Sequence, residues 1–280
     1  MTNALEIRGL TKRFPGFTLD GLDLTLPSGC VMGLVGENGA GKSTTIKLLL
    51  GMLRPDGGEI TILGKNGQAD VLTKEEIGVV LDEVGLPECL TAAKVGKVMA
   101  NTFRRWEPDT FESLIARLDI PRQTEFGKMS RGNKMKLGIA VAMSHGAKLL
   151  ILDEATGGLD PVVRDQVVDM LADFTRDEDH AVLLSSHIVS DLEKICDYIA
   201  FLHKGKLLLC REKDELLSEY GIVHCAPEQL NALDADAVLH RKDTYWGSEA
   251  IVRRDAAPEG MELSPVTIEE LFIYMVKEEK

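Results

Sequence analysis

Positive charge, cysteine and long apolar stretches are all scarce in this 280-residue sequence. Lys and Arg number 32 against 45 Asp and Glu. The net charge of −13 disfavours a nucleic-acid partner or direct adhesion to anionic lipids, because both are themselves negatively charged. The five cysteines are odd in number and include no C-x-x-C pair, so free thiols in a reducing compartment are favoured over a disulfide framework.

Signals for crossing or entering a membrane are also missing. No apolar run approaches the roughly 18 residues of a membrane-spanning helix. The first ten residues, MTNALEIRGL, lack the basic-then-apolar order of a secretion signal. Hydrophobic residues at 44% and charged residues at 28% are typical of a globular protein. The sequence therefore predicts a cytoplasmic protein of one large domain or two modest ones.

Strand and helix patterns alternate along most of the chain. Half-exposed alternation predicts antiparallel strands near the N-terminus, at residues 5–10 and 17–26. Short apolar runs separated by helical segments predict a parallel sheet covered on both faces. These further strands are expected at residues 30–35, 59–63, 77–81, 149–152, 182–185 and 199–203, with helices at 44–50, 162–174 and 189–196. From about residue 82 to 145 the strand signals vanish, and an inserted helical subdomain is predicted, with helices at 92–105, 111–118 and 131–143.

Beyond residue 210 the pattern weakens, and a small accessory α+β region is predicted at 211–280. Residues 211–220 are expected to be helical. Short strands are expected at 237–240 and 250–253. Thr267 and Glu270 fit a capping box, in which the hydroxyl and the carboxylate each bond an amide at the start of a helix. One stripe of that helix carries Ile268, Leu271, Phe272 and Met275.

A glycine-rich loop lies between the predicted strand 30–35 and the predicted helix 44–50. Residues 36–44 match the pattern G-x-x-x-x-G-K-[ST]. Converging backbone N–H groups and the positive end of the following helix bind polyphosphate, and glycine permits the positive φ angles of such a loop. We expect Lys42 to reach the β- and γ-phosphates of a nucleotide, and the Ser43 hydroxyl to ligate Mg²⁺. The predicted phosphate-binding residues are Gly36, Asn38, Gly39, Ala40, Gly41, Lys42, Ser43 and Thr44.

Two adjacent carboxylates, Asp153 and Glu154, end the predicted strand 149–152. Taken alone, an acidic pair at a strand end is most often a solvated edge. The carboxyl ends of strands in open α/β sheets are, however, where ligands bind. Given the phosphate-binding loop earlier in the chain, we expect Asp153 to bind Mg²⁺, directly or through water. Glu154 is expected to polarise an attacking water.

Together these motifs resemble those of ABC ATPases, the nucleotide-binding subunits of ATP-binding-cassette transporters. The resemblance covers residues 4–210 and includes further motifs in the family's order. Phe14 stands where the family places an aromatic ring that stacks on adenine. Residues 130–133 (SRGN) resemble the signature motif LSGGQ, and residues 158–160 (GLD) resemble the D-loop. His187 occupies the position of the family's switch histidine.

The resemblance implies a P-loop NTPase core with a mixed sheet, and ATP with Mg²⁺ as its ligands. It also implies that two cassettes, each formed by residues 1–210, enclose two ATP molecules between them. Ser130, Gly132 and Asp160 would then contact the nucleotide held by the opposite subunit, and His187 would bond the γ-phosphate and orient the attacking water. The catalytic residues that the resemblance implies are Lys42, Glu154 and His187.

The sequence departs from the family pattern at the helical insertion and at the signature motif. Asp82 stands where the family usually has a glutamine that contacts Mg²⁺; a carboxylate can still ligate Mg²⁺, but it adds negative charge near phosphate. Arg131 replaces the first signature glycine, where it either adds positive charge to phosphate or points to solvent. The pattern is similar to an exporter-type subfamily related to bacitracin-resistance and acetoin-linked ATPases.

The function that the resemblance implies is an ATPase subunit that powers a membrane permease on a separate chain, with export favoured. The subunit would pair with itself or with a second ABC ATPase, and would be held at the inner face of the cell membrane by the permease. Two alternatives stay open. A soluble ABC ATPase acting on ribosomes or DNA normally shows two cassettes or a long coiled coil, and a basic surface. A regulatory module that binds ATP with little turnover is permitted by Asp82 and the altered signature.

Overall fold

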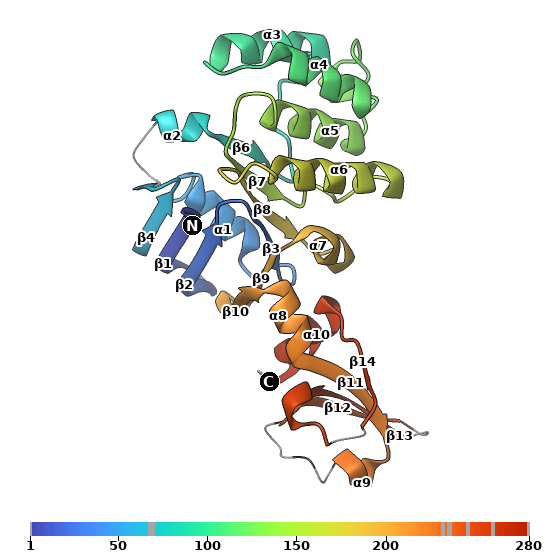
Figure 1. Ribbon diagram of the computed structural model, residues 1–280. Helices are drawn as coiled ribbons and strands as arrows, with labels where there is room; N and C mark the ends of the chain where they lie inside the picture. Colours follow the sequence, from blue (N-terminus) through green and yellow to red (C-terminus); the bar gives the residue numbers. More distant parts are fainter. Residues whose placement is uncertain are drawn as a thin grey trace.

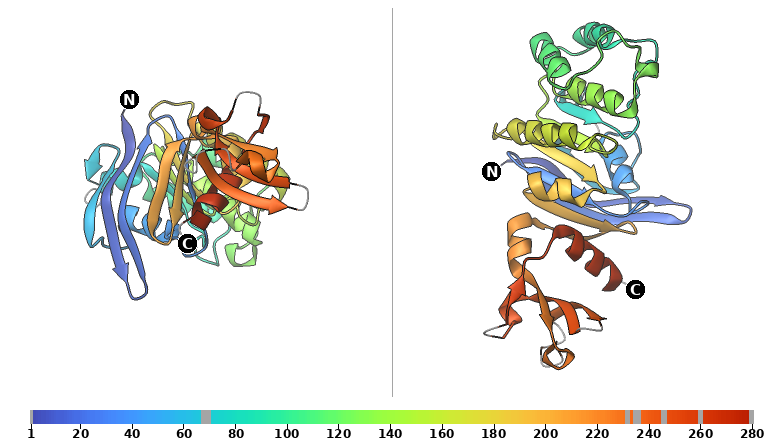
Figure 2. Two further views of the ribbon diagram at one scale, coloured as in Figure 1. Left: turned by 90° about the horizontal axis from the view of Figure 1, so that it is seen from below. Right: turned by 90° about the vertical axis from the view of Figure 1, so that its right-hand side faces the viewer.

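The computed structural model describes residues 2–66, 71–230, 233, 237–244, 247–258 and 261–278, so parts of the predicted accessory region lie outside the described residues. A block of helices, a body built on two sheets and a C-terminal sheet follow one another along the long axis of the molecule (Figures 1 and 2). Within those described ranges, no helix is both long and apolar enough to cross a membrane.

The first strands of the chain form an antiparallel sheet. They are β1 (Asn3–Phe14), β2 (Phe17–Pro27), β4 (Gly57–Ile62) and β5 (Lys65–Asn66). The strand order is β2-β1-β4-β5. The register of the β1–β2 hairpin pairs Leu5 with Leu26 and Phe14 with Phe17. This sheet confirms the predicted antiparallel N-terminal strands, and β4, predicted as a strand at residues 59–63, joins it.

A second, mixed sheet forms the centre of the body. In sheet order its strands are β10 (Lys206–Glu212), β9 (Tyr198–His203), β3 (Val31–Val35), β8 (Ala181–Ser186), β7 (Leu149–Asp153) and β6 (Ile77–Val80). Strands β9, β3, β8, β7 and β6 run parallel, and β10 is antiparallel to β9. All five residues of β3 and of β7 are buried, as a sheet covered on both faces requires.

The predicted helical insertion is present between β6 and β7. Its elements are α3 (Ala92–Thr102), α4 (Pro108–Arg117), the 3₁₀ turn η1 (Phe126–Lys128) and α5 (Arg131–Ala142), and a short helix α2 (Val71–Glu75) precedes β6. The Thr91 hydroxyl caps α3 by accepting from the amide of Lys94. Phe111 of α4 is buried, with its ring 5.1 Å from that of Trp106. This apolar contact holds the block together.

Helices cover both faces of the central sheet. They include α1 (Lys42–Leu49), α6 (Pro161–Phe174) and α7 (Val189–Ile195). Leu149 and Ile151 of β7 belong to a buried cluster that contains α1 and the N-terminal sheet. Leu150 and Leu152 belong to the opposite cluster, which contains α5, α6 and α7. Because successive side chains of a strand point to opposite faces, β7 contributes to both halves of the core.

The C-terminal region forms a third sheet beside two helices. Its elements are α8 (Lys213–Glu219), β11 (Tyr220–Cys225), α9 (Pro227–Leu230), β12 (Val238–Thr244), β13 (Gly247–Arg253), η3 (Arg254–Ala256), β14 (Leu263–Ser264) and α10 (Ile268–Glu278). The strand order is β12-β13-β11-β14. The helix predicted at 211–220 is shorter than expected, because β10 pairs with β9 as far as Glu212. Strands β11 and β14 were not predicted.

The predicted capping box at the start of α10 is confirmed. Thr267 Oγ1 accepts from the amide of Glu270 at 3.2 Å, and the Glu270 carboxylate accepts from the amide of Thr267 at 2.9 Å. The apolar stripe of α10 faces the body of the molecule, where the ring of Phe272 lies edge-on to Phe201 of β9 at 5.2 Å. A capped, amphipathic helix therefore joins the C-terminal region to the central core.

Candidate active site

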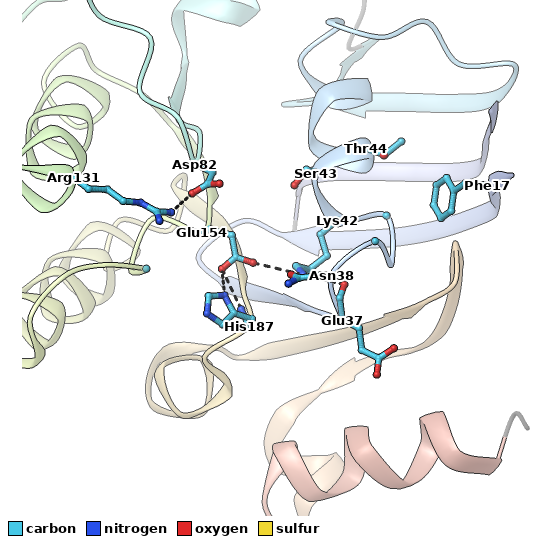
Figure 3. Close-up of a pocket in the computed structure, with 13 residues that line it drawn as sticks. Phe17, Glu37, Asn38, Lys42, Ser43, Thr44, Asp82, Arg131, Glu154 and His187 are labelled. Carbon is cyan, nitrogen blue, oxygen red and sulfur yellow. Dashed lines mark hydrogen bonds and ion pairs between the residues drawn. The ribbon is translucent and has the colours of Figure 1, made fainter. Parts of the chain in front are cut away.

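A cavity of about 500 Å³ lies at the carboxyl end of the central sheet (Figure 3). Its residues follow directly on the parallel strands: the glycine-rich loop follows β3, Glu154 follows β7, His187 follows β8, and Asp82 lies two residues beyond β6. Because parallel strands end at one edge of their sheet, residues far apart in the sequence meet there. The predicted site residues that line the cavity are Asn38, Gly39, Gly41, Lys42, Ser43, Thr44, Asp82, Glu154 and His187.

The glycine-rich loop has a backbone shape that two of its glycines make possible. Gly41 precedes the first residue of α1 with a φ of +115°, which residues with a side chain rarely adopt. A Cβ atom at Gly36 would lie 2.5 Å from the carbonyl oxygen of Leu202 in β9. The loop therefore curls tightly over the sheet and presents the N-terminus of α1 to the cavity, an arrangement that suits an anion.

Lys42 is the buried cation of the site. Its side chain is only 6% exposed, and its Nζ donates to the carbonyl of Gly36 at 2.7 Å. The same Nζ lies 3.6 Å from Oε1 of Glu154. A buried ammonium needs such partners, because desolvation without them is costly. Its charge is thus held between the loop and the carboxylate.

Glu154 is held in place by β8 and by the residue that follows it. Its φ is +53°, and its amide donates to the carbonyl of Ser185 at 3.1 Å. Its Oε2 accepts from Nδ1 of His187 at 2.5 Å and from the His187 backbone amide at 3.3 Å. In this arrangement the Nδ1 proton of His187 lies toward Glu154. The carboxylate therefore sits between one cation and one imidazole.

Asp153 lies just behind this carboxylate. It is 4% exposed, and its Oδ1 accepts from the Ser185 hydroxyl at 2.5 Å. Ser43 and Asp82 line the cavity, whereas Asp153 lies outside its lining. All three side chains carry oxygen donors, the kind that Mg²⁺ prefers. The residues predicted to hold Mg²⁺ thus fit a magnesium ion by their chemistry.

Asp82 and Arg131 form an ion pair that was not predicted. The Nη2 of Arg131 donates to Oδ1 of Asp82 in the same chain, and the Arg131 side chain is 63% exposed (Figure 3). A contact of Arg131 with phosphate stays a prediction. Both residues line the cavity. The attraction between the guanidinium of Arg131 and the nearby carboxylate of Asp82 is the physical reason for this contact. The spacing of the two residues in the sequence carried no signal for it.

Other predicted site residues lie outside the cavity lining. Ser130 caps α5 by accepting from the amide of Asn133 at 3.2 Å, and Asp160 caps α6 by accepting from the amide of Val163 at 3.1 Å. Gly132 packs near the carbonyl of Gly158. Their proposed contacts with a nucleotide in an opposite subunit stay a prediction. Gly36 and Ala40 belong to the glycine-rich loop but are buried behind its surface.

The aromatic residue that lines the cavity is Phe17, and the adenine contact of Phe14 stays a prediction. Phe14 is 37% exposed and does not line the cavity, whereas Phe17 does. The two residues are paired across the β1–β2 hairpin, with ring centroids 6.3 Å apart, and the Phe17 ring lies against Gly41. The sequence signal for Phe17 was available only through the hairpin pairing. Glu37 and Gly157 also line the cavity and were not predicted to do so, and Arg131, for which a phosphate contact was one alternative, lines it too.

Comparison with known proteins bears on what this cavity does. The family model described as ABC transporter matches residues 19–157. A Bacillus subtilis protein named as an uncharacterised ABC transporter ATP-binding protein, YhcH, is 31% identical over 99% of this chain and 92% of its own length. The chain belongs to the ABC transporter family. It is an ATP-binding subunit of that family, with the P-loop α/β fold and the ATPase activity that the sequence predicted.

Two further members of the ABC transporter family support this assignment. The bacitracin transport ATP-binding protein BcrA of Bacillus licheniformis is 32% identical over 74% of this chain and 69% of its own length. A solved structure of an ATP-binding subunit of an ABC transporter matches with a TM-score of 0.70 at 26% identity, covering 76% of this chain and 91% of that one. The similarity to the bacitracin-related subfamily is thereby confirmed.

Proposed function

We propose that this ABC ATPase hydrolyses ATP in the cavity and transmits the energy to a membrane permease on a separate chain. The observation that carries the proposal is the contact between Glu154, Lys42 and His187 at the carboxyl end of the central sheet. An anion-binding loop, a buried cation and an oriented carboxylate are the parts that phosphoryl transfer to water needs.

The residues of the chain divide the work as follows. The loop amides and Lys42 hold the β- and γ-phosphates. The triphosphate replaces Glu154 as the partner of the Lys42 ammonium, which leaves the Glu154 carboxylate free to accept a hydrogen bond from the attacking water. His187 holds Glu154 through Nδ1 and contacts the γ-phosphate. Mg²⁺, held by Ser43, Asp153 and Asp82, supplies positive charge to the phosphates when it is bound. Phe17, the aromatic residue that lines the cavity, is the proposed neighbour of the adenine ring of ATP.

We further propose that two copies, or this chain and a second ABC ATPase, close over two ATP molecules. Ser130 and Gly132 support this, because they lie outside the cavity of their own chain at the N-terminus of α5, whose amides suit an anion. Asp160 lies outside that cavity as well. Residues 1–210 would form the cassette, with helical insertion 82–145, and 211–280 the accessory region. The similarity to a Nod factor export ATP-binding protein of Rhizobium, 34% identical over 78% of this chain, supports export as the direction. In this arrangement the permease holds the chain at the inner face of the membrane.

Replacing Glu154 by Gln tests the assigned chemistry, because the change keeps the shape of the side chain and removes its charge. Phosphate release is expected to fall at least about 100-fold, the usual contribution of a positioned base, while ATP binding is retained. The matched control is Glu178→Gln, the same change at an exposed carboxylate outside the cavity lining, which is expected to keep wild-type turnover. Equal phosphate release from the wild type and Glu154→Gln would exclude the role given to Glu154.

The same Glu154→Gln protein tests the closure of two copies. With ATP bound and hydrolysis blocked, it is expected to elute as a dimer in size-exclusion chromatography, and as a monomer without nucleotide. An elution volume that does not change with ATP would contradict self-pairing, and the experiment would then be repeated with a second ABC ATPase.

A further inference from the structure

The two residues that depart from the family pattern, Asp82 and Arg131, contact each other. They are 49 residues apart in the sequence, and their ion pair joins the start of the helical block to the first residue of α5 (Figure 3). Both side chains line the cavity in which we place ATP. The pair therefore lies at the active site and not on a remote surface.

Asp82 needs a cation at this place. It adds a carboxylate to a cavity lining that already holds that of Glu154. Lys42 is engaged with Glu154 and with the carbonyl of Gly36. Among the described residues, Arg131 is the cation that pairs with Asp82. Without it, the Asp82 carboxylate would repel an incoming triphosphate.

Arg131 in turn needs an anion. It is the first residue of α5, and the first turn of that helix contains no acidic residue. The N-terminus of a helix carries partial positive charge, so an arginine there is disfavoured unless a carboxylate offsets it. The side chain also passes over Gly158, where a Cβ atom would lie 3.5 Å from Cδ of Arg131. This contact directs the guanidinium toward Asp82.

The ion pair between Asp82 and Arg131 is exposed to solvent. The side chains of Arg131 and Asp82 are 63% and 51% exposed. Ion pairs that are this exposed contribute little to stability and are weakened by salt. A role in holding the fold is therefore a poor explanation for the pair, whereas a role in setting the charge of the cavity needs only proximity.

We propose that Asp82 and Arg131 form one charge-compensated unit, in which Arg131 is a positioning residue that neutralises Asp82 and so allows the cavity to accept ATP before the cation binds. The negative charge that Asp82 adds to the cavity is then offset by the positive charge of Arg131, and ATP binding depends on the presence of both or of neither. This inference rests on the proposed function, because it assumes that the cavity binds ATP.

A double-mutant cycle tests the unit. The variants are Asp82→Asn, Arg131→Gln and the double variant, all of which keep the approximate shape of the side chains. Binding of trinitrophenyl-ATP is measured by fluorescence in EDTA, so that neither hydrolysis nor Mg²⁺ enters the result. Arg131→Gln is expected to weaken binding about threefold to tenfold, because it leaves the Asp82 charge uncompensated. The double variant is expected to return to within about twofold of the wild type.

Salt and a conservative variant separate charge from structure. The loss in Arg131→Gln is expected to shrink in 0.5 M salt, where charges are screened. Arg131→Lys is expected to bind as the wild type does, because it keeps the charge. If Arg131→Gln does not fold, ATP binding by Arg131→Lys still tests the proposal. Weakened binding in a folded Arg131→Lys protein counts against it.

Two results would overturn the inference. Arg131→Gln could weaken binding equally whether residue 82 is Asp or Asn, in which case Arg131 acts on ATP directly and not through Asp82. Alternatively, Arg131→Gln could bind as well as the wild type at low salt. Lys42→Ala in the same assay keeps these outcomes apart from a failure of the proposed function. If Lys42→Ala loses binding while the cycle is additive, only the inference fails; if Lys42→Ala binds normally, the cavity is not the ATP site.

Discussion

Single residues at the site are held by contacts that span the sequence. Glu154 has a left-handed backbone conformation, which costs roughly 1 kcal/mol or more in a residue other than glycine. Its amide bonds to Ser185 and its carboxylate to His187, and both partners belong to β8 or the residue after it. The strand next to β7 therefore stabilises the conformation that aims the carboxylate into the cavity.

Thiol chemistry gives a prediction at the same scale. Cys89 is exposed and Cys196 is buried, and burial raises the pKa of the Cys196 thiol. Burial also raises the pKa of the thiols of Cys30, Cys210 and Cys225. A thiolate is the reactive form, so a maleimide reagent at neutral pH is expected to label Cys89 first and Cys196 only after unfolding. Peptide mass spectrometry after timed labelling measures the order, and early labelling of Cys196 would contradict the burial of this residue.

The types of residue at the site were predictable, but several of their contacts were not. The loop motif and the strand-end carboxylates identify Lys42 and Glu154, because the chemistry demands those residues at that spacing. The presence of Phe17 in the cavity lining, beside its hairpin partner Phe14, depends on how the hairpin places two paired rings. The pairing of Asp82 with Arg131 depends on how the helical block folds back on β6. Neither geometry has a local sequence signal.

At the scale of elements, burial decides what could be predicted. Strands β3, β7 and β8 are mostly apolar and buried along their whole length, and each was predicted from the sequence. Strand β10 is only half-buried, and its last two residues were assigned to the predicted helix 211–220, so its pairing with β9 was not predicted. Strands β5 and β14 are two residues long, too short for any periodicity.

The junction between α5 and β7 gives a prediction about pH. His145 is 2% exposed, its ring stacks on Phe103 at 4.1 Å, and burial lowers its pKa, while the hydrogen bond to the carbonyl of Glu75 opposes the shift. Below about pH 6.5 the unfolded chain binds a proton that the folded chain does not, so stability falls as the pH falls. Below about pH 6.5 the free energy of unfolding therefore decreases with falling pH, and His145→Gln is expected to reduce this dependence by up to about 1.4 kcal/mol per pH unit.

Urea unfolding at pH 7.5, 6.5 and 5.5 measures the slope. His224→Gln is the matched control, because the His224 side chain is 62% exposed, and its replacement is expected to change the slope little. If His145→Gln and the wild type lose stability in parallel between pH 6.5 and 5.5, other groups cause the acid sensitivity.

At the scale of the whole molecule, one buried cluster connects distant parts of the chain. It includes Phe111 of the helical block, Phe201 of the central sheet, and Leu271 and Phe272 of α10. Contacts between α10 and α7 are reinforced by the amide of Ile268, which donates to the Glu193 carboxylate at 2.6 Å. The stability of the C-terminal region is therefore tied to that of the body.

Replacing Phe272 by Ala is expected to destabilise the protein by about 3 kcal/mol, because Phe272 is 9% exposed and its removal leaves a cavity against Phe201. The thermal unfolding midpoint, followed by calorimetry, is the measurement. Ile273→Ala on the same helix is the control, since Ile273 is 41% exposed, and only a small shift is expected. Similar shifts in the two variants would contradict the docking of α10.

The C-terminal sheet is attached to the body at both of its ends. On one side β10 leads into α8, where the amide of Lys213 donates to the carbonyl of Asp197 at 2.7 Å and its Nζ to the carbonyl of Glu193. On the other side α10 returns to the same Glu193. Ile222 and Ile251 of this sheet belong to the same buried cluster as Phe201 and α10. Trimming the chain from its end would therefore strip α10 away and uncover the central core and the C-terminal sheet together.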